Sequence, residues 1–284
     1  MRSRPAGVSA IRDRMIRRCR AGVETQFLLE GDWRTFLLRG GSGAPVVLLH
    51  GAGGGGILWA PVLKSLAGHF HAIVPDIIGF GESAKPPANY DKRFFAAWLQ
   101  RVLDGVGVDR VSLIGNSMGG SIAMQYALEH PQRIDKIILV GSAGLGFKGF
   151  SGTVLLAMAA AVLLPTASTT RRLARYLVAC PDRLTANEEL AYLLAVARSA
   201  GARRQFLRGK GSVVRPYPSA RLNTIQISTL LLWGEADRVM SIDNALRGLR
   251  CIRRATLRII PDAGHVPYYD QPAEFCRHVI DFLK

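Results

Sequence analysis

Cysteine is scarce in this sequence, and it is not arranged for a metal or a redox pair. The four cysteines lie far apart, and no Cys-x-x-Cys occurs. No group of four His and Cys positions has the spacing of metal ligands, so we expect no metal site. We expect reduced cysteines in a cytoplasmic protein; a disulfide between two of them is the alternative.

Long apolar runs are also missing. The longest, residues 154–164, has eleven residues, whereas a helix that crosses a bilayer needs about 20. The arginine-rich N-terminus is not followed by an apolar stretch, so it does not fit a secretory signal. We therefore expect the run 154–164 to form a buried helix or one that seeks a surface.

Acidic residues are few compared with basic ones: 21 against 37, for a net charge of +16. The excess lies mainly in residues 1–20, with seven arginines and one aspartate, and in residues 145–225, with twelve basic and three acidic residues. Such stretches can attract nucleic acid, anionic lipid or acidic substrates. Arginines and aromatics are not interleaved as in nucleic-acid modules, so we expect no nucleic-acid partner. Weak contact with an anionic membrane surface stays open, as does a role in solubility alone.

Short apolar runs alternate with helical patterns along most of the chain. The expected strands are 35–39, 46–50, 71–76, 111–115, 136–141, 229–234 and 255–261, and the helices between them are near 57–68, 91–105, 118–130, 241–250 and 273–284. Several strands are apolar on both faces, as strands buried between helices are. This order predicts an α/β fold with a mostly parallel central sheet and helices on both faces.

The alternation is interrupted once, over residues 145–224, where helical patterns and four prolines occur without a strand pattern. We predict a helical cap there, over a core formed by 23–144 and 225–284. A helical excursion without a functional role is the alternative. The basic segment 1–22 can form an amphipathic helix that docks on the domain, touches a membrane surface or frays.

One serine lies where a strand should become a helix. The stretch "GNSMGG", residues 115–120, follows an apolar strand and precedes an amphipathic helix. Gly-x-Ser-x-Gly in that setting is the nucleophile elbow, a strained turn that projects the serine oxygen beyond the strand ends. The N-terminus of the following helix favours a developing anion. We therefore predict Ser117 as a nucleophile.

A serine hydroxyl needs a base, and the base needs an orienting acid. His265 follows the last expected strand, and Asp237 follows the strand before it. The chain order Ser117, Asp237, His265 is the one expected for this elbow. Glu235 and Asp262 are the alternatives for the acid.

The transition state also needs hydrogen-bond donors. "HGAGGGG" ends a strand in a loop with five glycines among six residues, and glycine lets main-chain N–H groups approach a ligand closely. We predict an oxyanion hole from the N–H group of Met118 and one from Ala52 or Gly53. Neither a complete phosphate-binding loop nor a dinucleotide fingerprint is present, so we expect no nucleotide.

These motifs together resemble the α/β-hydrolase superfamily. "HGAGGGG", "PDIIGFGES", "GNSMGG", "EHPQRIDKIILVG", "LLLWGEADRV" and "PDAGHVPYYDQPAEF" occur in family order over residues 35–144 and 225–284. The resemblance implies an α/β-hydrolase fold with a cap, a serine-hydrolase activity and no metal or organic cofactor. Dehalogenases and epoxide hydrolases of this fold look excluded, since they use an aspartate where Ser117 stands.

Within that superfamily, "GNSMGG" with a glycine-rich loop looks most like the meta-cleavage product hydrolases, which cut carbon–carbon bonds. That group usually carries a tryptophan directly after the catalytic histidine, where this chain has Val266. It also carries a cap arginine that pairs with the substrate carboxylate, for which Arg198, Arg203 and Arg204 are candidates. Asn116 either contacts a polar group of the substrate or supports the elbow.

The same residues serve carboxylesterases. We expect hydrolysis of a small-molecule carboxylic ester through an acyl-enzyme, with carbon–carbon bond hydrolysis as the alternative. A catalytically inactive binding protein of the same fold is a third hypothesis, which the complete Ser-His-Asp set disfavours.

Overall fold

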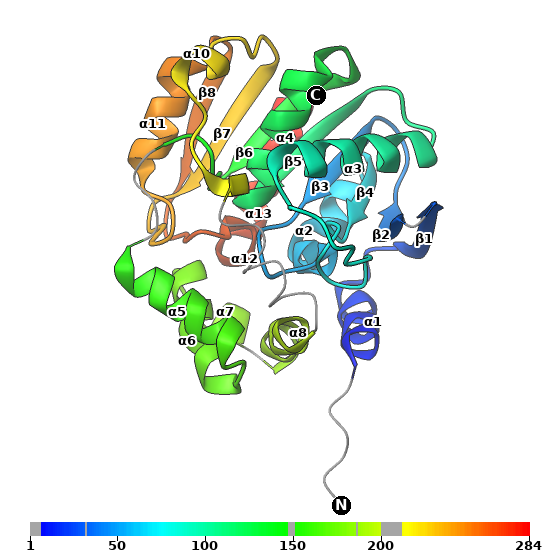
Figure 1. Cartoon of the computed structure of the whole chain (residues 1–284), viewed down its shortest axis with the longest axis vertical. Coiled ribbons are helices and arrows are strands. Elements are labelled where there is room, and N and C mark those ends of the chain that lie inside the picture. The colour runs from blue at the N-terminus through cyan, green and yellow to red at the C-terminus, as the bar shows by residue number, and fades with distance from the viewer. Residues whose placement is uncertain (1–6, 32, 147–150, 186, 200–211) are drawn as a thin grey trace, which may run out of the picture.

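A sheet of eight strands forms the centre of the molecule in the computed structural model, which describes residues 7–31, 33–146, 151–185, 187–199 and 212–284 (Figure 1). The strands are β1 Glu24–Glu30, β2 Trp33–Gly40, β3 Pro45–Leu49, β4 His71–Pro75, β5 Val111–Asn116, β6 Ile134–Val140, β7 Ser228–Gly234 and β8 Ala255–Ile260. Their order is β1-β2-β4-β3-β5-β6-β7-β8. The pairs β1–β2 and β2–β4 are antiparallel, and the other neighbours are parallel. The predicted α/β class with a mostly parallel sheet is confirmed.

Strand β1 was not among the predicted strands. It pairs with β2 along its whole length at the edge of the sheet. Only one of its apolar side chains, Leu28, is buried, whereas Phe27 and Leu29 are exposed. An edge strand that buries so little lacks the apolar run by which the buried strands were recognised.

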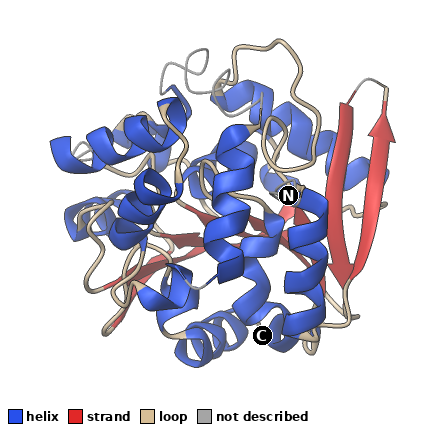
Figure 2. Cartoon of the chain, turned by 90° about the horizontal axis from the view of Figure 1, so that it is seen from below, coloured by secondary structure: helices blue, strands red, loops and turns tan. Residues whose placement is uncertain are grey.

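Helices cover both sides of the sheet (Figure 2). They include α1 Val8–Cys19, α2 Ala60–Ala67, α3 Lys92–Gly105, α4 Met118–Glu129, α11 Ile242–Cys251 and α13 Pro272–Leu283. Buried side chains of α3, α4 and α11 belong to one apolar cluster, and those of α1, α2 and α13 belong to a second. The sheet therefore separates two apolar layers.

Strand β6 shows why these strands are apolar on both faces. Ile137 and Leu139 belong to the first cluster, and Ile138 and Val140 belong to the second. Successive side chains of a strand point to opposite faces, so a strand with helices on both sides needs apolar residues at every position.

Between β6 and β7 the described residues contain helices and no strand. The helices are α5 Gly152–Leu163, α6 Ala167–Leu177, α7 Asp182–Thr185, α8 Asn187–Arg198, the short η3 Ser212–Val214 and α10 Ser219–Leu222. Helices α5 to α8 lie together below the sheet in Figure 1. The division into core and cap at 145 and 224 remains our proposal.

The basic N-terminal helix α1 docks on the domain, one of the three outcomes expected from the sequence. Ile11 and Met15 are buried against it. Arg14 and Arg18 each lie 3.2 Å from a carboxylate oxygen of Glu188 on α8, and Arg18 also pairs with Glu189. The arginines of α1 thus join the start of the chain to the helices between β6 and β7.

Candidate active site

Ser117 lies at the turn from β5 into α4 in a strained backbone conformation. Its φ is +53° and its ψ is −114°, a region that non-glycine residues seldom occupy. Its N–H group donates to the carbonyl oxygen of Val140 at the end of β6, at 2.9 Å. A Cβ on Gly115 would collide with the backbone of Gly119, and one on Gly119 would collide with the carbonyl of Leu49. The turn therefore requires both glycines of the motif.

His265 and Asp237 form a buried pair. Nδ1 of His265 lies 2.9 Å from Oδ2 of Asp237, and the two side chains are 4% and 2% exposed. The other oxygen, Oδ1, accepts hydrogen bonds from the N–H groups of Val239 at 2.8 Å and Met240 at 2.9 Å. These two bonds hold the carboxylate in one orientation toward the imidazole.

The two alternative acids lie elsewhere. Glu235 and Asp262 are both exposed. Asp262 has a φ of +51°, as a residue in a tight turn can have. Of the three acids considered from the sequence, Asp237 is the one that the structure places against His265.

Asn116 joins the serine turn to the histidine loop. Its Nδ2 donates to the carbonyl oxygen of His265 and to that of Val140, each at 3.1 Å. Its Oδ1 accepts from the hydroxyl of Tyr268 at 3.4 Å. Of the two roles considered for Asn116, these contacts match support of the elbow.

Gly141, directly after β6, was not singled out from the sequence. Its φ is +48°, and a Cβ at this position would lie 2.9 Å from Nδ1 of His265 and 3.1 Å from Oδ2 of Asp237. The preceding residue, Val140, receives the hydrogen bonds of Asn116 and Ser117. The end of β6 therefore lies between the serine turn and the His265–Asp237 pair. In the sequence, the signal available for Gly141 was a glycine directly after the apolar run "KIILV".

The glycine-rich loop begins beside Ser117. A Cβ on Gly51 would lie 3.4 Å from the Cβ of Ser117. Ala52 is exposed, and Gly53 has a φ of +76°. Met118 is buried at the first position of α4. The predicted donors of the oxyanion hole thus belong to two segments that meet at Ser117, and their function remains a proposal.

Buried His50 holds the start of this loop. The Ile77 N–H group donates to Nε2 at 2.9 Å, and Nδ1 lies 2.7 Å from the carbonyl oxygen of Gly51. Nε2 is therefore the acceptor and Nδ1 carries the proton, the neutral imidazole. Burial lowers the pKa of His50 to about 4.

Buried Asp76 holds the far end of the loop. Its carboxylate accepts from the N–H groups of Gly56 at 2.6 Å and Glu82 at 2.7 Å. Burial raises the pKa of Asp76 to about 6, although the two hydrogen bonds act in the opposite direction. We interpreted Asp76 as structural from the sequence, and its contacts are of that kind.

Tyr192 on α8 also reaches the glycine loop, and it was not predicted. A Cβ on Gly55 would collide with the Tyr192 hydroxyl. The side chain is fully buried, and burial raises its pKa well above the usual value, helped by the nearby carboxylate of Asp76. No local pattern distinguishes this tyrosine from an ordinary core residue of an amphipathic helix.

Of the three candidate cap arginines, Arg198 is the one that the structure describes. Arg198 is exposed, and its Nε donates to the carbonyl oxygen of Pro165 at 3.1 Å. Arg203 and Arg204 lie outside the described residues. In the part of the chain that the structure describes, no three His, Cys, Asp or Glu side chains are grouped to hold a metal ion.

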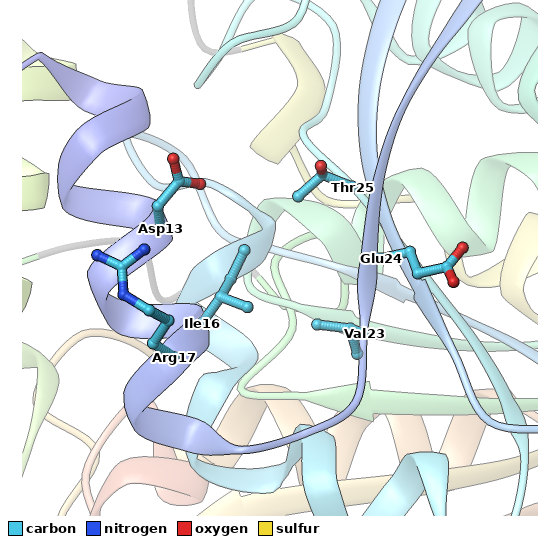
Figure 3. Close-up of a pocket in the computed structure, with 6 residues that line it drawn as sticks. All are labelled: Asp13, Ile16, Arg17, Val23, Glu24 and Thr25. Atoms are coloured by element: carbon cyan, nitrogen blue, oxygen red, sulfur yellow. The ribbon is translucent and has the colours of Figure 1, made fainter.

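A separate hollow lies between α1 and β1 (Figure 3). It is lined by Asp13, Ile16, Arg17, Val23, Glu24 and Thr25. It contains none of Ser117, Asp237 and His265, so it is not part of the candidate site.

His50 and Asp76 should titrate at unusual pH values. The pKa of His50 lies below its ordinary 6.5, so its contribution to the unfolding free energy falls as the pH is lowered from about 6.5 to about 4. The pKa of Asp76 lies above its ordinary 3.8, so its contribution falls as the pH rises from about 4 to about 6. Because these trends oppose each other, the measurement must resolve single sites.

We expect NMR midpoints near pH 4 for the His50 ring and near pH 6 for the Asp76 carboxyl carbon. His50→Gln and Asp76→Asn assign the two signals. Midpoints at the ordinary values would contradict the burial of these groups.

Comparison with known proteins identifies the family. The family described as alpha/beta hydrolase fold matches residues 44–272. The 2-hydroxy-6-oxo-2,4-heptadienoate hydrolase of Pseudomonas putida is 32% identical over 273 residues, 91% of this chain and 95% of the relative. The crystal structure of a bacterial membrane phospholipase A is 29% identical, with a TM-score of 0.83 over 97% of this chain and 90% of its own. A Bacillus subtilis carboxylesterase is 22% identical, with a TM-score of 0.86 over 97% and 96% of the two chains, which shows the shared fold alone. This chain therefore belongs to the alpha/beta hydrolase fold family and is a hydrolase of that fold.

Proposed function

We propose that this enzyme is a serine hydrolase that cleaves a carboxylic ester, with Ser117 as nucleophile, His265 as base and Asp237 as the orienting acid. One observation carries the proposal. The strained turn that presents Ser117 is tied through Asn116 and the end of β6 to a buried His265–Asp237 pair with a separation of 2.9 Å. These are the elements that acyl transfer to a serine requires.

The geometry of the pair assigns the proton transfers. Nδ1 of His265 faces Asp237, so Nε2 is the nitrogen left to act on Ser117. Ser117 Oγ attacks the ester carbonyl carbon while Nε2 takes its proton, and the resulting imidazolium is stabilised by Asp237. Nε2 then gives the proton to the leaving alcohol, and the acyl group stays on Ser117. A water molecule that loses a proton to Nε2 attacks the acyl-enzyme, which releases the acid and restores Ser117.

Main-chain donors would stabilise the oxyanion in both steps. The N–H group of Met118 opens α4, and one from Ala52 or Gly53 belongs to the loop that abuts Ser117. A preorganised donor of this kind contributes a factor of about 10² to 10³ in kcat. Asp76 and His50 would act only indirectly, because they hold the two ends of that loop.

The one described candidate for binding a substrate carboxylate, Arg198, favours an ester, because its guanidinium group is bonded elsewhere. Arg198 is exposed and bonded to Pro165, and Val266 stands where the meta-cleavage group usually has tryptophan. Carbon–carbon bond hydrolysis is the second candidate. It is favoured by the 32% identity to the Pseudomonas putida heptadienoate hydrolase, and relatives named as 2-hydroxymuconate semialdehyde hydrolase and phenylhexadienoate hydrolase are 30% and 29% identical.

A substrate panel separates the two candidates. Purified enzyme is assayed with aryl esters of increasing acyl length and, in parallel, with a 2-hydroxy-6-oxo-dienoate ring-fission product. Preferred turnover of esters supports the proposal. A dienoate kcat/KM that exceeds every ester value would replace it with carbon–carbon cleavage, and no turnover of either would favour a binding protein.

Ser117→Ala should abolish turnover of any substrate that the panel identifies. Loss of a serine nucleophile costs up to about 10⁶-fold in kcat in a comparable triad. The variant removes only the hydroxyl, so circular dichroism and the thermal midpoint should match wild type. A folded Ser117→Ala protein with wild-type turnover would overturn the assignment.

Asp237→Asn should lower kcat by about 10⁴-fold, because the amide favours the wrong tautomer of the histidine. Glu235→Gln is the matched control, since it changes an exposed acid two residues away in the same loop. We expect near wild-type kcat for the control. The reverse pattern would transfer the role of the acid to Glu235.

Gly141→Ala should lower kcat without removing any catalytic group. The added methyl would press on both His265 Nδ1 and Asp237 Oδ2, and a misplacement of about 1 Å can cost about 10²-fold. Gly107→Ala is the control: its φ is also positive, at +71°, but a Cβ there meets nothing within 4 Å. Both variants should lose some stability, and only Gly141→Ala should lose kcat at a temperature where both are folded. Equal kcat values would contradict this positioning effect.

A further inference from the structure

Helix α5 exposes an apolar face. Its sequence, GTVLLAMAAAVL, contains no charged residue. Val154, Ala157 and Ala161 point into the domain and are buried. On the other side, Leu155, Leu156 and Leu163 are 49%, 60% and 47% exposed, and Leu164, just beyond the helix, is 67% exposed. We call these four residues the leucine face.

The leucine face is unusual for a surface helix. At about 100° per residue, Leu155, Leu156 and Leu163 fall within roughly a third of the helix circumference. Single exposed leucines are common, whereas a group of them on one element marks an interaction site. An ordinary surface helix would carry charged or polar residues on that side.

Helix α6 follows α5 and packs beside it (Figure 1). Thr170 and Ala174 of α6 are buried, whereas Arg171, Arg172 and Arg175 are exposed. Together with Arg238, Ser168 and Tyr176, these arginines line a hollow of about 540 Å³. We call the four arginines the arginine cluster.

The arginine cluster carries charge that other described residues leave unneutralised. The lining of the hollow includes no acidic residue. None of the four guanidinium groups is within ion-pair distance of a carboxylate in the described part of the chain. By contrast, several other arginines, such as Arg12 and Arg18, are paired with acids. An anionic partner would therefore gain favourable contacts here without displacing an ion pair to a described carboxylate.

We propose that the leucine face and the arginine cluster form a docking surface for an anionic lipid membrane. A helix that lies in the membrane interface places apolar side chains among the acyl chains and cations among the headgroups. The adjacent helices α5 and α6 offer those two chemistries side by side. A second copy of this chain suits the surface less well, because a symmetric contact would bring two arginine clusters together in a protein of net charge +16.

The docking is peripheral. No helix among the described residues has the length and apolarity to cross a membrane. Helix α5 has 12 residues, or about 18 Å at 1.5 Å per residue, against a hydrocarbon core of about 30 Å. The helix can therefore lie in the interface but cannot span it.

The end of α6 is fixed to the loop that carries His265. The carboxylate of buried Asp270 accepts hydrogen bonds from the N–H groups of Ala179 at 2.9 Å and Cys180 at 3.1 Å. The Val266 N–H group donates to the carbonyl oxygen of Leu177 at 2.9 Å. The end of α6, the helix that carries most of the arginine cluster, is therefore hydrogen-bonded to the segment that follows His265.

Vesicle co-sedimentation of the full chain tests the proposal. The Ser117→Ala protein is used, so that binding is measured without turnover and its result is independent of the proposed reaction. We expect binding to vesicles of equal parts phosphatidylcholine and phosphatidylglycerol, at least about tenfold weaker binding to pure phosphatidylcholine, and weakening of the former by salt.

Two variants remove the two parts of the surface. Arg171→Gln/Arg172→Gln/Arg175→Gln should weaken binding about a hundredfold, since each cation near an anionic surface contributes about fivefold. Leu156→Gln/Leu163→Gln should weaken it by a comparable factor through lost apolar burial. The same substitutions are also made in the protein that keeps Ser117. There the circular dichroism spectrum and the rate of hydrolysis of a soluble ester should stay near wild type.

Matched controls exist elsewhere on the molecule. Arg250→Gln/Arg253→Gln/Arg254→Gln removes the same charge from exposed positions around the start of β8. Leu29→Gln/Ile259→Gln removes two apolar side chains that are 68% and 46% exposed on β1 and β8. Both controls should keep wild-type vesicle binding.

Three results would overturn the proposal. The first is no binding to the anionic vesicles, or equal binding to both kinds. The second is a loss of binding in the controls equal to that in the variants, which would mean that binding depends on the overall charge or apolarity of the protein and not on this surface. The third is concentration-dependent self-association that Leu156→Gln/Leu163→Gln abolishes, without vesicle binding, which would make the leucine face a contact between copies.

Discussion

The arrangement of the site depends on the backbone of Ser117, which is held at a φ of +53° between β5 and α4. That conformation is costly for a residue with a side chain, by about 1–3 kcal/mol. The conformation persists because contacts with neighbouring segments fix the backbone on both sides of Ser117. Its N–H group is bonded to Val140, its carbonyl accepts from Ala143, and glycines are required two residues before and after it. The same turn starts α4, so the first N–H groups of the helix lie next to the serine.

The end of β6 connects the parts of the site. Val140 receives hydrogen bonds from the turn, and Gly141 leaves room for the His265–Asp237 pair. Asn116 adds a direct bond from the turn to the His265 backbone. Parallel strands bring their carboxyl ends to one edge of the sheet, which is why residues distant in sequence meet there. A change at Gly141 or Asn116 would therefore alter the relative positions of Ser117 and the His265–Asp237 pair.

Buried His50 and Asp76 hold the two ends of the glycine loop, and the hydrogen bonds that each side chain makes depend on its protonation state. Neutral His50 accepts from one segment and donates to another, which an imidazolium cannot do. Asp76 accepts hydrogen bonds from two backbone N–H groups, and its burial raises its pKa. Tyr192 of α8 touches the same loop. The helices between β6 and β7 thus reach the glycine loop at this tyrosine. The N-terminal helix contacts α8 through Arg14 and Arg18.

The sequence alone determined the class of the fold and named the candidate triad, because those features have local signals. Strands apolar at every position mark a sheet between helices, and Gly-x-Ser-x-Gly marks a turn that few other residues can form. Edge strand β1 was not predicted, because it buries few apolar side chains. The roles of Gly141 and Tyr192 were not predicted, because a glycine after a strand and a tyrosine in a helix are common in any sequence. Chain order favoured Asp237 and left Glu235 and Asp262 as alternatives. Only the tertiary structure shows which carboxylate lies against His265, because that depends on how two separate loops meet. The exposure of the α5 leucines likewise depends on which face packs inward, and a helix that is apolar all round carries no sign of that choice.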